Sequence, residues 1–279
     1  MTYSINTNYN ILNLNYTKTQ QKKQSETEVQ DNNHPTTSGN KNIAFYGFDL
    51  VKKKEIPPIL SEMFEAIKDK KDEELAETAY PYLVKYIGVE DVAPPKITWE
   101  KTEGRPIVAD YKVFENSIVI YSDLFKKVSK AEQLAFIAHE LTHCKQSFNM
   151  MRTENIGIEK YAYANAVSDF RAATVRNKNI INALIEAKRN NKEKELIQYL
   201  IQKATINNIK ELKQTYPNFD KLSKIKSTSI EGQKAQTDLK AQFEYNGADI
   251  NAYNNCPLEK EAIEKENEII KIYKQSIYL

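Results

Sequence analysis

The chain has 279 residues, of which 41% are hydrophobic and 28% are charged, as is ordinary for a globular protein. Lysine and arginine total 40 against 38 acidic residues, and the resulting net charge of +2 gives no reason to expect nucleic acid or an anionic membrane as a partner. No apolar run approaches the roughly 18 residues of a membrane-spanning helix, and the first residues lack the pattern of a secretory signal. We expect a cytoplasmic protein, or one exported without a cleaved signal peptide.

Residues 1–42 are rich in Asn, Thr, Gln and Ser. Their low apolar content does not offset the entropy lost on ordering, so they are predicted to form a disordered tail. Residues 58–87 repeat apolar side chains at spacings of three and four, with a short charged break, which indicates helix. Gly88 is the expected helix stop.

The spacing of apolar side chains changes after Gly88. Residues 96–101 alternate apolar and polar side chains, and residues 107–113 and 117–121 are rich in β-branched and aromatic side chains. This pattern predicts two or three antiparallel strands.

Ser129 and Glu132 form an S-x-x-E capping box, which predicts a helix from Lys130 to about Asn149. One stripe of this helix is apolar and should face a core: Leu134, Ile137, Leu141, Cys144 and Phe148.

Residues 155–240 are predicted to be mostly helical, with breaks near 177, 190–191 and 217, and Pro257 begins a final helix to about 275. The fold class is therefore α+β and predominantly helical. We expect two subdomains after the tail, residues 43–150 and residues 151–279.

Residues 138–146 read AHELTHCKQ. His139 and His143 are four residues apart on the capped helix, so both imidazoles project from one face. Two such nitrogens can occupy two corners of a tetrahedral Zn²⁺ site. Glu140 lies about 100° around the helix, where a carboxylate can act as a general base without binding the metal. No other cofactor is indicated.

A third ligand is required, and histidines are scarce. The only other histidine, His34, lies in the predicted tail. The longer motif with a third histidine six residues after His143 is absent, since Asn149 stands there. The third ligand should therefore be a carboxylate from further along the chain.

Residues 255–264, NCPLEKEAIE, contain the segment Glu259-Lys260-Glu261-Ala262. Together with the first motif, this segment resembles the zincin-like metallopeptidases of the glutamate-ligand (gluzincin) type, in which a second helix provides an E-x-x-A glutamate. The resemblance covers roughly residues 80–150 and 250–275. It implies a zincin-like fold with a small antiparallel sheet, and zinc held by His139, His143 and Glu259.

The chain departs from the family pattern in two ways. Many members have Asp four residues after the ligand glutamate, where this chain has Ile263, so another residue must support the histidines. The two motifs are also separated by a long interval, which predicts a helical insertion before the third-ligand helix. Glu261 and Asp249 remain alternative third ligands.

Several further residues could belong to the site. Tyr253 and Tyr245 are candidate oxyanion donors, because no histidine remains for that role. Gln146 faces the zinc side, where it lines the site or caps backbone groups. Cys144 lies on the apolar stripe, and a disulfide with Cys256 requires an oxidising compartment.

We therefore expect zinc-dependent hydrolysis of a peptide or protein substrate, with Glu140 as general base. The strand at 117–121 is expected to pair with the substrate as an edge strand. Two alternatives remain: a zincin-like binding module without catalysis, and a helical interaction protein with an accidental motif.

Overall fold

The computed structural model describes residues 56–102, 107–244 and 255–277. The predicted tail at 1–42 lies outside the described residues, and so does the start of the first predicted subdomain. His34, Tyr245, Asp249 and Tyr253 also lie outside them. Every statement below concerns the described part of the chain.

Helices account for most of the described residues, and three short strands form one sheet. The predicted α+β, predominantly helical class is confirmed. The elements are α2 (Pro58–Ala66), α3 (Asp72–Ile87), β1 (Lys96–Glu100), β2 (Ala109–Lys112), β3 (Ser117–Tyr121), α4 (Ser122–Phe125), α5 (Lys130–Arg152), α6 (Gly157–Arg176), α7 (Lys178–Arg189), α8 (Glu193–Thr215), η1 (Phe219–Lys221), α9 (Ile230–Glu244) and α11 (Pro257–Ile277).

The sheet is mixed, so the prediction of a purely antiparallel sheet is wrong. The strand order is β1-β3-β2, with β2 antiparallel and β1 parallel to β3. A short turn that includes Asn116, at φ +46°, joins β2 directly to β3 and permits only an antiparallel pair. β1 pairs with the opposite side of β3 after a longer connection, and alternation of side chains carries no information on strand direction.

The helix α5 begins as the sequence predicts. Ser129 accepts a hydrogen bond from the backbone N–H of Glu132, and the Glu132 carboxylate accepts one from the backbone N–H of Ser129 at 2.7 Å. The predicted apolar stripe is at most 1% exposed. The helix runs to Arg152, three residues further than predicted, and it is buried on more than one face. It is therefore the central helix of the molecule.

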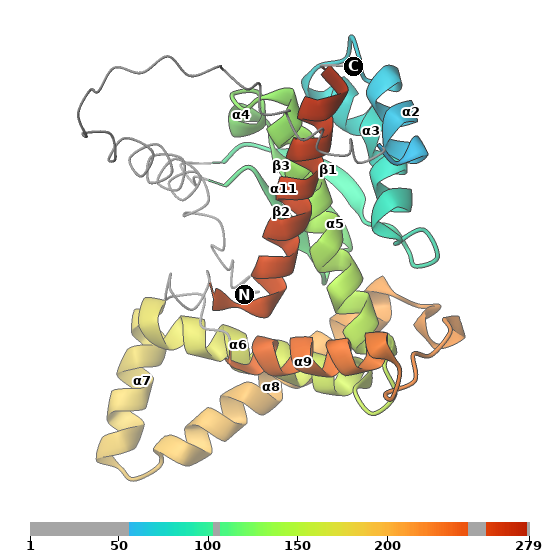
Figure 1. Cartoon of the computed structure of the whole chain (residues 1–279). Coiled ribbons are helices and arrows are strands. Elements are labelled where there is room, and N and C mark those ends of the chain that lie inside the picture. Colours follow the sequence, from blue (N-terminus) through green and yellow to red (C-terminus); the bar gives the residue numbers. More distant parts are fainter. Residues whose placement is uncertain (1–55, 103–106, 245–254, 278–279) are drawn as a thin grey trace, which may run out of the picture.

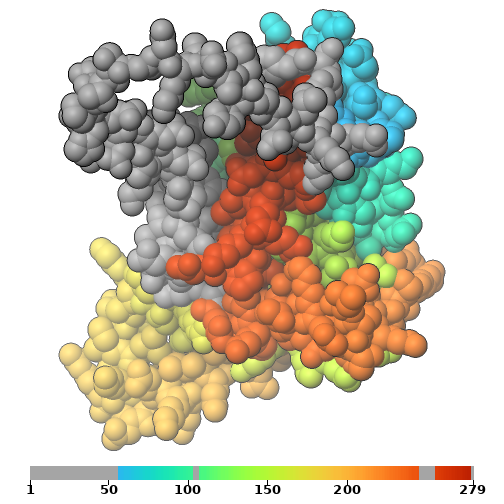
Figure 2. Space-filling view, in the orientation of Figure 1, coloured from blue at the N-terminus to red at the C-terminus, as the bar shows by residue number. Residues whose placement is uncertain are grey.

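The helix α11 packs along α5, although the two are far apart in the sequence. Figure 1 shows α11 lying beside α5 along much of its length, with α2 and α3 to one side. In the space-filling view α11 covers much of α5 on that face (Figure 2). This packing brings the two sequence motifs together.

The predicted helix boundaries in the second half of the chain are confirmed. Asn177 ends α6 and caps α7, since its side chain accepts hydrogen bonds from the backbone N–H groups of Asn179 and Ile180. Asn190 follows α7, and Pro217 follows α8.

The predicted helix stop at Gly88 is also confirmed. Gly88 ends α3 at φ +77°, in the left-handed conformation that glycine adopts readily.

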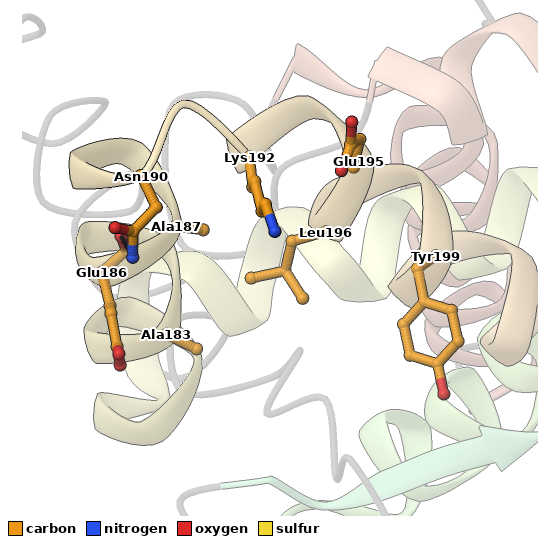
Figure 3. A pocket seen from close by; sticks show the side chains of 8 residues that line it. All are labelled: Ala183, Glu186, Ala187, Asn190, Lys192, Glu195, Leu196 and Tyr199. Atoms are coloured by element: carbon orange, nitrogen blue, oxygen red, sulfur yellow. Dashed lines mark hydrogen bonds between the residues drawn. The ribbon is translucent and has the colours of Figure 1, made fainter.

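A hollow of about 430 Å³ lies between α7 and α8, and Leu196 and Tyr199 are among the side chains that line it (Figure 3). None of the predicted site residues lines this hollow.

One buried core joins residues of α2, α3, the sheet, α5, α6, α8, α9 and α11, and the division into two subdomains stays a prediction. Within the described ranges, no helix is both long enough and apolar enough to cross a membrane.

Candidate metal centre

His139 and His143, from the middle of α5, lie close to Glu259 from the first turn of α11. Their ligand atoms all lie within 4.8 Å of one another. The Nε2 atoms of the two histidines are 3.1 Å apart. Glu259 Oε2 lies 3.6 Å from His139 Nε2 and 3.4 Å from His143 Nε2. The three atoms therefore form a nearly equilateral triangle.

This triangle fits a tetrahedral zinc ion. Bonds of ~2.0–2.1 Å at tetrahedral angles place neighbouring ligand atoms about 3.3–3.4 Å apart, and the three observed distances bracket that value. Glu259 Oε2 is also buried without a hydrogen-bond partner in the described structure. A buried carboxylate oxygen in that condition is costly unless a cation or donor satisfies it. The donor set of two imidazoles and one carboxylate suits Zn²⁺.

The far nitrogens of both imidazoles face acceptors from the protein. His143 Nδ1 lies 2.9 Å from Gln146 Oε1. The Gln146 amide is oriented by its Nε2, which donates to the Leu258 carbonyl at 3.0 Å and to Glu261 Oε2 at 2.5 Å. Its Oε1 therefore accepts a hydrogen bond from the Nδ1–H of His143. That hydrogen bond leaves His143 Nε2 with a lone pair for a metal.

The other imidazole has a carboxylate in the corresponding place. His139 Nδ1 lies 3.2 Å from Glu266 Oε2, which is within ion-pair distance. The angle is not that of a formed hydrogen bond, and this nitrogen has no other hydrogen-bond partner in the described structure. His139 is thus enclosed by two acids of α11, one at each ring nitrogen.

Glu140 is adjacent to the cluster and is 4% exposed. The backbone N–H of Tyr111 in β2 donates to its Oε2 at 2.8 Å, and this bond connects the sheet to α5. Burial raises the pKa of Glu140 above its usual range, against the opposing charges of His139 and His143. The carboxylate is positioned beside the ligand atoms without being one of them.

Charges within the cluster shift the pKa values in opposite directions. Burial alone would raise the pKa of Glu259, but the neighbouring His143 and His139 hold it well below its usual range. Burial alone would lower the pKa of His139, and its contacts with Glu259 and Glu266 raise it instead. The pKa of His143 is raised in the same way by Glu259. The site therefore strongly favours an anionic Glu259 beside positive charge.

The alternative ligand Glu261 is not part of the triangle of ligand atoms. Its carboxylate accepts from Gln146 and forms an ion pair with Lys234 at 2.7 Å. Asp249, Tyr245 and Tyr253 lie outside the described residues, so the structure does not bear on their proposed roles. Cys144 and Cys256 are both buried and free, and burial raises the pKa of Cys144 to about 12.

The prediction that residues 117–121 bind the substrate as an edge strand is wrong, because β3 is the central strand and pairs on both sides. The edge strand next to the site is β2. The backbone N–H of Tyr121 donates to the Val108 carbonyl at 2.9 Å. Along β2 the backbone N–H and C=O groups of alternate residues bond to β3, so those of Tyr111 point to the outer edge of the sheet. That outward edge is the one that contacts Glu140.

Two contacts were not predicted from the sequence, those of Glu266 and of the Tyr111 backbone N–H. The signal for Glu266 is its spacing, since seven residues after Glu259 a helix returns to nearly the same face. No sequence signal points to Tyr111, because its contact depends on a backbone N–H and on the packing of β2 against α5. Backbone donors are common to every non-proline residue.

Part of the chain is similar to a known protein family. Residues 111–214 match the model of Peptidase family M48, a zincin-like metallopeptidase family with an HExxH motif. No curated protein and no solved structure gave a significant match. The matched segment begins in β2, contains β3, α5 and its HELTH sequence, and ends in α8, before α11. Residues 111–214 of this chain are accordingly similar to the zincin-like metallopeptidases of family M48.

Proposed function

We propose that the protein is a zinc-dependent peptidase in which His139, His143 and Glu259 hold the metal and Glu140 is the general base. The observation that carries this proposal is the triangle of ligand atoms from α5 and α11, with a buried carboxylate beside it. The match to a metallopeptidase family supports the reaction class.

The protein residues have separate tasks in this reaction. Zinc bound at the three ligands would lower the pKa of a water molecule and polarise the scissile carbonyl. Glu140 accepts the proton of the attacking water and delivers it to the leaving amine. The Tyr111 N–H holds one oxygen of Glu140 and so fixes the direction of the other. Gln146 holds His143 in the tautomer that binds metal.

The substrate is proposed to be an extended peptide or protein segment that lies along the outer side of β2. An edge strand can bind an extended chain through main-chain hydrogen bonds. The hydrogen bond from the Tyr111 N–H to Glu140 supports this location, because it joins the outer edge of β2 to the proposed general base. Main-chain binding of this kind depends little on the side chains of the substrate.

The proposal is tested by the metal content and proteolytic activity of the purified full chain. We expect about one zinc per chain in the wild type, loss of that zinc in His143→Ala, and slow cleavage of fluorescein-labelled casein. Zinc binding without cleavage, for casein and for a mixed-sequence peptide library, would favour a zincin-like binding module. Absence of zinc would favour an interaction protein in which the motif is accidental.

A further inference from the structure

His139 is held between two carboxylates of the same helix. Glu259 Oε2 faces its Nε2 at 3.6 Å, and Glu266 Oε2 faces its Nδ1 at 3.2 Å. All three side chains are buried or nearly so, with exposed fractions of 2% for His139, 10% for Glu259 and 13% for Glu266. Neither acid is therefore an ordinary solvated charge on a helix surface.

The spacing of the two acids explains how one helix contacts both sides of the ring. Seven residues advance an α-helix by about 10.5 Å and rotate it by about 700°, which is 20° short of two full turns. Glu259 and Glu266 therefore lie on one face of α11. Ala262 lies between them on that face and is fully buried, and its small side chain leaves room for the neighbouring helix. Ile263 is aliphatic and offers no acceptor.

The two metal-facing histidines have different partners at Nδ1. His143 has the neutral amide oxygen of Gln146, and His139 has the charged carboxylate of Glu266. A carboxylate at Nδ1 fixes the Nδ1–H tautomer, orients the ring and makes Nε2 a stronger ligand. The 3.2 Å between His139 Nδ1 and Glu266 Oε2 is within the distance range of an N–H···O hydrogen bond.

We propose that Glu266 is a positioning residue that orients His139 for zinc and strengthens it as a ligand. This inference rests on the proposed function, because it assumes that His139 binds the metal through Nε2. It assigns to Glu266 a contribution to metal affinity that Glu264 and Glu268, on other faces of α11, do not share.

The test compares zinc affinity and histidine NMR in three variants of the full chain. Glu266→Ala removes the acceptor, and Glu266→Gln keeps an acceptor oxygen of the same size without the charge. Glu264→Gln is the matched control, because Glu264 is an exposed acid of the same helix. Zinc dissociation constants are measured by competition with a chromophoric chelator, and the Nδ1–H resonances are observed in the ¹⁵N-labelled zinc-loaded protein.

We expect Glu266→Ala to weaken zinc binding about 10–100-fold, Glu266→Gln to weaken it less, and the control to bind like wild type. The Nδ1–H resonance of His139 should move upfield in Glu266→Ala, while that of His143 stays in place. A residue that only stabilises the fold would not move the resonance of one histidine alone.

An unchanged dissociation constant and an unchanged His139 resonance in Glu266→Ala would overturn the inference. If circular dichroism shows that Glu266→Ala is unfolded, the same two measurements on Glu266→Gln decide. A wild type that binds no zinc overturns both the inference and the proposed function. A wild type that binds zinc without hydrolysing peptides overturns only the role of Glu140, and a weakened Glu266→Ala then still supports the inference.

Discussion

Glu140 is separated from the metal ligands by its position on α5 and by its hydrogen bond to β2. One of its oxygens accepts from the Tyr111 backbone N–H, and none of its oxygens belongs to the triangle of ligand atoms. Metal binding and proton transfer are therefore assigned to different side chains. Substitutions at the two kinds of position should then have different effects.

Glu140→Gln should retain zinc and lose hydrolysis. The amide has the same shape but cannot accept a proton, so casein cleavage should fall by more than the ~10²–10⁴-fold of a single acid–base contribution. Zinc content and casein cleavage are measured on the same preparation, with Glu264→Gln as the control. Turnover at the wild-type rate would rule out Glu140 as the base.

Asp169 on α6 is expected to make stability depend on pH. Burial raises its pKa from 3.8 to about 7, so the folded protein binds the proton more tightly than the unfolded chain. The contribution of protonated Asp169 to the free energy of unfolding is complete below about pH 4 and is lost as pH rises through about 7. The difference between the two pKa values corresponds to at most about 4 kcal/mol in the free energy of unfolding. Because Asp169 retains partial exposure, we expect about 1–2 kcal/mol.

Asp169→Asn should remove this dependence. The free energy of unfolding is measured with urea at pH 5 and at pH 8. From pH 5 to pH 8 the wild type should lose about 1–2 kcal/mol more of this free energy than the variant. The same experiment on an exposed acid of α9, Glu231→Asn, provides the control. A constant difference between Asp169→Asn and wild type across this range would contradict the shifted pKa.

Two helices build the site, and one small side chain lies between the two acids of α11. The helix α11 packs against α5, and Ala262 of α11 is fully buried. Its neighbours on the same face of α11 are Glu259 and Glu266. A larger side chain at this position would push both acids away from His139.

Ala262→Leu should weaken zinc binding and lower stability together. Overpacking a tight interface costs about 1–3 kcal/mol, and displacement of α11 would separate Glu259 from the two histidines. Asn267→Leu places the same side chain on the exposed face of α11 and should change neither property. Chelator competition and thermal unfolding measure the two effects. Normal zinc affinity in Ala262→Leu would show that α11 adapts without moving its acids.

At the scale of the whole molecule, the proposed metal joins parts of the chain that are far apart in sequence. His139 and His143 come from the central helix α5, and Glu259 comes from the last helix, α11. The segment between them forms α6 to α9 and contributes to the same hydrophobic core. An ion held by both helices should therefore stabilise the complete fold.

Zinc should raise the melting temperature of the full chain. Free zinc at about 1,000 times its dissociation constant adds about 4 kcal/mol of stability, which corresponds to about 8–16 °C for a protein of this size class. Excess EDTA should reverse the shift. Glu140→Gln should show the full shift, whereas His143→Ala and Glu259→Ala should show little of it. Equal shifts in all three variants would indicate zinc binding elsewhere.

Local features of the structure followed from the sequence because they depend on neighbouring residues. The capping box at Ser129, the buried stripe of α5, the stop at Gly88 and the helix boundary at Asn177 each arise from contacts within a few positions. The HELTH spacing also places His139 and His143 on one face by helix geometry alone. Their roles as ligands, like that of Glu259, stay predictions.

The remaining features were decided by tertiary structure. Strand direction and order depend on how the connections cross the sheet, so the parallel pairing of β1 and the central position of β3 were not predictable from alternation. The contacts of Glu266 with His139 and of Tyr111 with Glu140 depend on where α11 and β2 pack against α5. Sequence alone determined the helices and the residue types of the site, because both are local properties. Only the packing of distant elements decided which carboxylate faces each histidine and which strand faces the base.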